Sequence, residues 1–212
     1  MRYRGWIAAL IAGACLLPMQ ASAQETRFPA WRVMGFGAVW AETNLPELPY
    51  NAISGKLRFH DTGFLGLEVS RVLVRDFDIP LGFTTLSGND LELNAQVLKH
   101  WGHQKHVELV GALAWRSGEW WFSRHLGVNM AAGFGFSQAL KKPTYEKGPQ
   151  GIRGVDTRKF QFHILGELEF TPADAPDWHM VLRLQHRSGI WGVISPRKTG
   201  SNYLGLGIRK DF

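Results

Sequence analysis

His186 and Ser188, two residues apart, have the side chains that nucleophilic catalysis needs. A serine hydroxyl becomes an activated nucleophile when a neighbouring imidazole takes its proton and a third polar group orients the ring. Asn202 can supply that third group if the segments around residues 186 and 202 are adjacent strands. The chemistry therefore depends on the elements that position these three side chains.

Apolar and polar residues alternate with a period of two along most of the chain, and breaks rich in Gly, Pro, Asn and Asp separate the alternating segments. This pattern predicts β-strands. The stretch 52–60 also alternates, but we assign it to a long first extracellular loop, because a ninth strand would put the two termini on opposite sides of a membrane. Counting back from Phe212, we predict eight strands, near residues 31–41, 63–74, 90–101, 105–116, 125–138, 158–171, 177–188 and 201–212.

The strands are about ten residues long, which is enough to cross a bilayer at a tilt. Aromatic residues gather near the segment ends, as in interfacial girdles, and the polar faces mix Glu and Arg with Gly. These features predict an all-β fold, an eight-stranded antiparallel outer-membrane β-barrel with its apolar face outward. Its interior has room for side chains only, so a diffusion pore is not expected. A periplasmic β-sandwich is the alternative fold.

Residues 1–23 have the pattern of a secretory signal peptide: Arg2 and Arg4, an apolar run over residues 6–19, and Ala21-Ser22-Ala23 as the cleavage site. A lipoprotein site at Cys15 fits less well, because residues 12–14 lack a large aliphatic side chain. We therefore expect a barrel domain over residues 24–212, located in the outer membrane of a Gram-negative bacterium.

The composition of the 212 residues excludes several classes of protein. The net charge of +6 would suit a nucleic-acid partner, but export and the absence of basic patches argue against one. Removal of the signal peptide takes away the single cysteine, so no internal disulfide is expected. We expect outer-membrane lipid as the partner, no cofactor, and a monomer or homodimer.

In the last hairpin the alternation places polar groups on the lipid-facing side. On the strand near 177–188, the outward positions are apolar until His186 and Ser188 at its extracellular end. The next outward position after Leu204 on the final strand is Asn202. Opposed residues on paired strands lie ~5 Å apart, so the three side chains can meet. The alternative is that they are ordinary polar strand ends at the membrane–water boundary.

The exported start, the eight-strand layout, the terminal Phe212 and His186-x-Ser188 in the next-to-last strand resemble the lipid A 3-O-deacylases, with a looser likeness at residues 133–137. That resemblance implies His186 as general base, Ser188 as nucleophile, and a carboxylate on the final strand. In this chain Asn202 stands at the position of the acid. Gly189 stands where the family has an Asn linked to the oxyanion hole, and its backbone N–H is our candidate oxyanion donor.

The resemblance implies a carboxylic ester hydrolase that removes a 3-O-linked acyl chain from lipid A of lipopolysaccharide. Basic loop residues are candidates for holding the lipid A phosphates: Arg187, Arg197 and Lys198, with Lys141 and Lys142 in a neighbouring loop. One alternative is a non-catalytic barrel with an envelope-integrity or ligand-binding role. Another is a related modification of lipid A by different chemistry.

Two further clusters could have a function, but we favour a structural role for both. His100, His103 and His106 span a turn where three imidazoles can bind zinc or copper. We instead expect His100 and His106 to end the polar interior face, with no metal. Four acids and two arginines can pair inside the barrel, and we expect their role to be structural: Glu92, Glu108, Glu167 and Glu169 with Arg183 and Arg209.

Overall fold

The structure, a computed structural model, describes residues 31–147, 153–154, 156–197 and 199–212, so the predicted signal peptide lies outside the described residues. The described part is almost entirely β. Its strands are β1 (Trp31–Ala41), β2 (Phe59–Pro80), β3 (Thr85–Gly102), β4 (Val107–Arg116), β5 (Trp120–Ser123), β6 (Leu126–Ala139), β7 (Phe160–Pro172), β8 (Trp178–Ser188) and β9 (Gly200–Asp211). Its short helices are η2 (Leu45–Glu47), α2 (Leu48–Ile53) and η4 (Ile190–Gly192).

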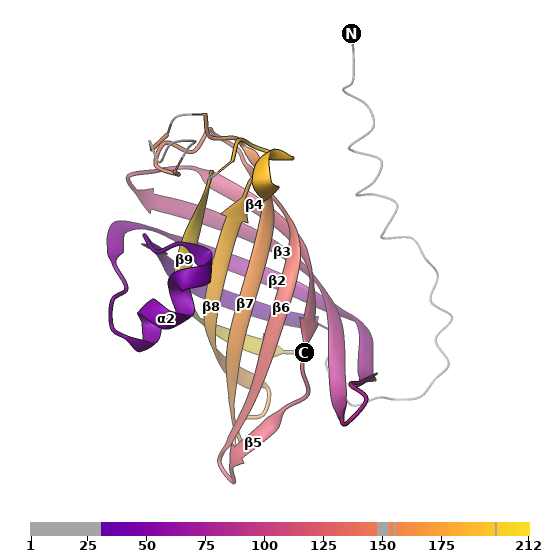
Figure 1. The fold of residues 1–212 in the computed structure, drawn as a ribbon. Coiled ribbons are helices and arrows are strands. Elements are labelled where there is room, and N and C mark those ends of the chain that lie inside the picture. The colour runs from indigo at the N-terminus through magenta and orange to yellow at the C-terminus, as the bar shows by residue number, and fades with distance from the viewer. Residues whose placement is uncertain (1–30, 148–152, 155, 198) are drawn as a thin grey trace.

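Eight of these strands form a closed ring. Each pairs antiparallel with its neighbour along the chain, β1 also pairs with β9, and β4 pairs directly with β6. Closure leaves no open sheet edge among the eight, which a strand in lipid requires. The tilted strands wind around one axis (Figure 1). The prediction of an eight-stranded antiparallel barrel is confirmed.

The structure differs from the predicted strands in two places. β5, a strand of 4 residues, pairs only with β6 at one rim, so it adds a flap and leaves the ring of eight unchanged. β2 and β3 extend past the predicted ends into a long hairpin with several register shifts. The first strand is 31–41, as predicted. The loop after it contains α2, and only Phe59 and His60 of the stretch 52–60 belong to a strand.

The two faces of the ring have opposite chemistry. Large apolar side chains remain exposed around the outside, among them Leu65, Phe134 and Leu206, each more than half accessible. The inside holds buried charges, including Arg183, Arg209 and Glu92. An apolar belt outside a polar interior is the pattern of a barrel in lipid, and it excludes the β-sandwich, whose core is apolar. The chain is therefore an outer-membrane β-barrel.

The interior charges form a network that joins Glu167 and Glu169 to Arg183 and Arg209, as predicted, whereas Glu108 pairs with His100 and Arg187. Glu167 accepts hydrogen bonds from Arg116 at 2.8 Å, from Arg209 at 2.9 Å, and from Arg183. Glu68, which the sequence did not single out, accepts from Arg183 at 2.6 Å. Buried charges persist only when they are paired, so this network is part of the core of the barrel.

The two rims of the barrel are distinct. The first and last described strands meet at one rim, where the backbone N–H of Phe212 donates to the carbonyl of Trp31 at 2.9 Å. The β8–β9 connection, with η4, lies at the other rim (Figure 1). No helix in the described part of the chain is long and apolar enough to cross a membrane. The short α2 lies outside the barrel beside β8 and β9 (Figure 1).

Candidate active site

The last hairpin brings the three candidate catalytic side chains together. His186 lies directly opposite Asn202 in the β8–β9 ladder, and Ser188 lies opposite Gly200. The flanking positions Gln185 and Arg187 are buried in the interior, so His186 and Ser188 project outward by strand alternation. His186 and Ser188 lie at the end of β8 and Asn202 near the start of β9, at the rim of the β8–β9 connection.

A hydrogen bond orients the imidazole of His186. Its Nδ1 lies 2.5 Å from Oδ1 of Asn202, and the amide nitrogen of Asn202 donates to the backbone carbonyl of Thr43 at 2.6 Å. Because that second bond fixes which amide atom faces the ring, Nδ1 of His186 must carry the hydrogen. Nε2 then carries the lone pair and is free to act as a base.

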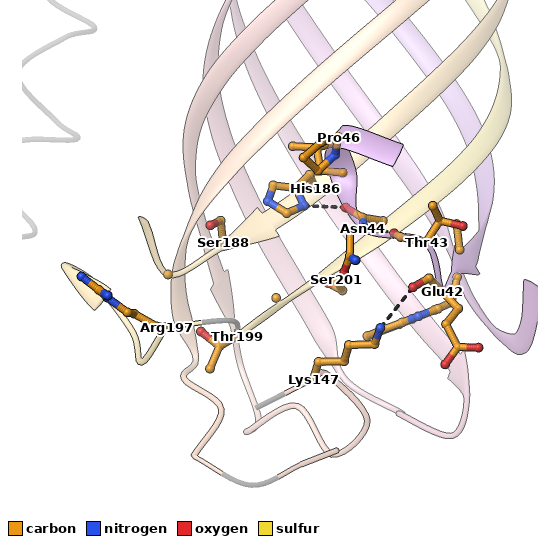
Figure 2. A pocket seen from close by; sticks show the side chains of 16 residues that line it. Glu42, Thr43, Asn44, Pro46, Lys147, His186, Ser188, Arg197, Thr199 and Ser201 are labelled. Carbon is orange, nitrogen blue, oxygen red and sulfur yellow. Dashed lines mark hydrogen bonds between the residues drawn. The ribbon is translucent and has the colours of Figure 1, made fainter. Parts of the chain in front are cut away.

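Ser188 lies on the other side of the imidazole from the Asn202 contact (Figure 2). Its Oγ accepts a hydrogen bond from the backbone N–H of Ile190 at 3.2 Å, which leaves its own hydrogen available to a base. Ile190 has a φ of 45°, a strained conformation for a β-branched residue. Such strain is typical of functional loops, and here it directs a backbone N–H at the hydroxyl oxygen.

Gly189 is enclosed by its own loop. Its carbonyl accepts hydrogen bonds from the backbone N–H groups of Gly192, at 3.3 Å, and Ile194, at 3.0 Å. A side chain at Gly189 would collide with Ser195 and Thr199. Only glycine fits this position without moving the loop, so the turn after Ser188 is tightly defined.

The first loop forms the wall of a pocket over these residues. The pocket has a volume of about 890 Å³ and contains both polar and apolar side chains. Thr43 to Pro46 come from the first loop and cover the outward side of Asn202, which is only 8% exposed. The sequence predicted a long first loop but not its place in the pocket, because the residues of the loop follow no periodic pattern. The lining residues labelled in Figure 2 include Glu42, Thr43, Pro46, His186 and Ser188.

Charged residues surround the mouth of the pocket. Glu42 lies 3.1 Å from Nε2 of His60 and 3.0 Å from Arg153. The hydrogen bond from His60, helped by nearby cations, holds the pKa of Glu42 below its usual value. Lys147 donates to the backbone carbonyl of Glu42 at 3.1 Å, and Arg197 also lines the pocket. Lys147 and Arg197 therefore bring two cations to the pocket that contains Ser188.

The structure corrects one predicted phosphate contact. Arg187 is 1% exposed and points into the barrel, where it donates to Glu146 at 2.5 Å and to Ser137 at 2.8 Å. Its neighbours on β8 face outward, so the alternation of the strand itself turns Arg187 away from lipid headgroups. Lys198 lies outside the described residues. Lys141 and Lys142 line a separate pocket beside His106.

No protein-family model matches this chain, and no curated protein matches it. Among solved structures it is similar to the outer membrane enzyme PagL, with a TM-score of 0.56 and 11% identity over 85% of this chain and 99% of that one. Neisserial surface protein A (TM-score 0.45, 8% identity, 86% and 97% coverage) and LpxR from Salmonella typhimurium (0.35, 11%, 89% and 69%) also match. The likeness to PagL shows that the chain has the fold of a small outer-membrane β-barrel protein.

Proposed function

We propose that this protein is a lipid A-modifying esterase of the outer membrane, with the activity of a lipid A 3-O-deacylase. One observation carries the proposal: an outward-facing His186, oriented by Asn202, shares a pocket with Ser188. His186 and Ser188 lie on the outward face of β8, so an acyl chain could reach them without leaving the membrane. The paired apolar neighbours Phe162 and Ile164 on β7 continue the lipid-facing surface beside it.

In the acylation step, Oγ of Ser188 attacks the carbonyl carbon of the ester while Nε2 of His186 takes its proton. The Nδ1–H of the resulting imidazolium donates to Asn202. An amide stabilises that charge less than a carboxylate does, so Asn202 acts chiefly by fixing the ring. The C–O bond to the sugar then breaks, and the sugar oxygen takes the proton from His186.

Deacylation repeats these steps with water. Nε2 of His186 removes a proton from a water molecule, the hydroxide attacks the acyl–Ser188 ester, and the proton returns to Oγ as the fatty acid leaves. We assign the oxyanion donor to the backbone N–H of Gly189. The backbone N–H of Ile190, which already contacts Oγ, is a second donor at the same turn.

The phosphates of lipid A are assigned to cations at the rim of the pocket. Arg197 and Lys147 line it directly, and Lys198 is adjacent in sequence to Arg197. An arginine binds phosphate through paired N–H donors, and a lysine acts as a point charge. With these contacts the sugar headgroup would lie over the loop side of the pocket and the acyl chain would descend along the barrel.

Mass spectrometry of lipid A tests the proposal. Cells expressing the protein should lose one 3-hydroxyacyl chain from lipid A, and cells expressing Ser188→Ala at the same level should keep it. Ser70→Ala is a matched control, because Ser70 is buried in the interior, does not line the pocket, and donates to Glu68 at 3.1 Å. An unchanged lipid A profile with abundant folded wild-type protein would overturn the proposal and favour the non-catalytic barrel.

A further inference from the structure

A second polar cluster lies inside the barrel, between the end of β3 and the start of β4. His100, His106 and Glu108 are 2%, 3% and 1% exposed, so none of them is solvated. One potential ligand atom from each lies within 4.8 Å of the others. Of the three histidines that the sequence singled out, His103 does not join them; its ring stacks on Tyr145 at 4.6 Å.

The two imidazoles converge on one carboxylate oxygen. Oε2 of Glu108 lies 3.0 Å from Nε2 of His100 and 3.9 Å from Nε2 of His106, and the two rings stack 4.2 Å apart. Nε2 of His106 and Oε1 of Glu108 are both buried without a hydrogen-bond partner. Either atom can therefore bind a ligand without losing an existing hydrogen bond.

The side-chain amide of Gln104 indicates which ring nitrogen of His100 carries the hydrogen. The amide nitrogen of Gln104 lies 2.5 Å from the hydroxyl of Tyr203, which is short for N–H···O but ordinary for O–H···O. Turning the amide over places Oε1, otherwise unpartnered, at this position. Oε1 then accepts from Tyr203 and from Nδ1–H of His100, 3.4 Å away.

This hydrogen pattern leaves the lone pair of His100 Nε2 pointing at a carboxylate. Nε2 of His106 faces the same carboxylate, 3.9 Å from its Oε2. Arg187 supplies one positive charge beside this group, with its NH1 3.5 Å from Glu108 and 2.5 Å from Glu146. Two imidazole nitrogens and a carboxylate that face one another can bind a cation between them. In a metal-binding histidine, the ring nitrogen that does not contact the metal usually donates its hydrogen to an oxygen, as Nδ1 of His100 would to Gln104.

We propose that His100, His106 and Glu108 bind a divalent transition-metal ion, with zinc as the best match. Two imidazole nitrogens and a carboxylate oxygen are a zinc donor set. The ion would join the end of β3 to the start of β4 and stiffen the hairpin between them. Its role is structural and does not depend on the esterase chemistry.

The route to this site affects how it is tested. His106 also lines a pocket of about 280 Å³ that includes three lysines: Lys105, Lys141 and Lys142. These positive charges oppose entry of a cation, so exchange into the folded barrel should be slow. Metal is therefore best supplied while the full chain refolds in detergent.

The experiment refolds untagged protein with Zn²⁺ or with Co²⁺, removes excess metal, and measures bound metal and thermal unfolding. We expect one metal per chain, a higher unfolding temperature than for protein refolded with chelator, and the visible absorption of four-coordinate Co²⁺. His106→Ala should lower zinc affinity by at least roughly 10-fold. His103→Ala, the matched control, should bind as the wild type does.

Folded wild type that binds no zinc overturns the proposal, and so does equal binding by His106→Ala. If that variant does not fold, zinc X-ray absorption of the wild type decides. A first shell with two imidazoles supports the site, and one without imidazole overturns it. Neither measurement involves lipid A, so this proposal and the esterase proposal can fail separately.

Discussion

The charged interior and the outward polar trio both consist of polar side chains on barrel strands, but these side chains are held in different ways. Inside, Glu167 contacts three guanidinium groups, and each of these reaches further acids. Outside, His186 is linked to Asn202, and Asn202 to the carbonyl of Thr43. A group with many partners cannot move without breaking several bonds. In the outward trio, His186 ends a series of single hydrogen bonds and lies in a pocket, so its other ring nitrogen stays free to react.

Removal of the base should have the largest effect. We expect His186→Ala to lower the rate of ester cleavage by about 10²- to 10⁴-fold, because the proton of Ser188 loses its acceptor. Activity is measured as fatty acid released from lipid A in detergent micelles. The variant should still fold, shown by the mobility of the unboiled protein on a gel. Full activity in folded His186→Ala would remove it from the site.

A change in the interior should lower the stability of the barrel rather than its catalytic rate. Glu167→Gln removes the buried charge that three arginines share, and we expect a loss of about 3–5 kcal/mol in stability. The measurement is urea unfolding in lipid vesicles. The exposed Glu47→Gln is the control and should shift stability by no more than about 0.5 kcal/mol. If Glu167→Gln left stability unchanged and lowered activity instead, the distinction between the two regions would fail.

Asn202 tests how the imidazole is held. Asn202→Ala removes a hydrogen bond that becomes charge-assisted in the transition state, worth about 1.5–3 kcal/mol, or roughly 10- to 150-fold in rate. Asn202→Asp should retain more activity than Asn202→Ala, since a carboxylate also orients the ring. Equal rates for Asn202→Ala and the wild type would mean that another group orients His186.

The smallest effect concerns the first loop and pH. Because the pKa of Glu42 is lowered by His60, folded protein binds that proton less tightly than unfolded protein does. The contribution of Glu42 is complete above its ordinary value of 4.5 and is lost as the pH falls through the lower folded value. Glu42 is 38% exposed, so we expect less than about 1 kcal/mol.

Hydrogen exchange of first-loop peptides measures this effect. Protection of residues 42–58 should fall on acidification in the wild type, while Glu42→Gln should be poorly protected at every pH. Peptides from β6 serve as the reference for intrinsic exchange. Parallel pH profiles for the two proteins would show that Glu42 does not hold the loop.

Much of the fold could be predicted because strand alternation is a local property. A period of two indicates both the strand and its two faces, so the eight strands, the apolar exterior and the pairing of interior charges followed from the chain itself. The same parity placed His186, Ser188 and Asn202 on one outward face. Arg187 occupies an inward-facing position of the same strand, so its assignment to lipid phosphates was inconsistent with the alternation.

Residues outside the regular strands could not be placed in the same way. The carbonyl of Thr43 reaches Asn202 across 159 positions of sequence, and Glu108 meets His100 and His106 only after the β3–β4 hairpin closes. The conformation of a loop depends on which distant groups it contacts, and the alternation of apolar and polar residues does not predict those contacts. The chain alone therefore determined the barrel and the face of each strand residue. Tertiary packing decided the pocket wall, the orientation of the imidazole and the makeup of the interior His–Glu cluster.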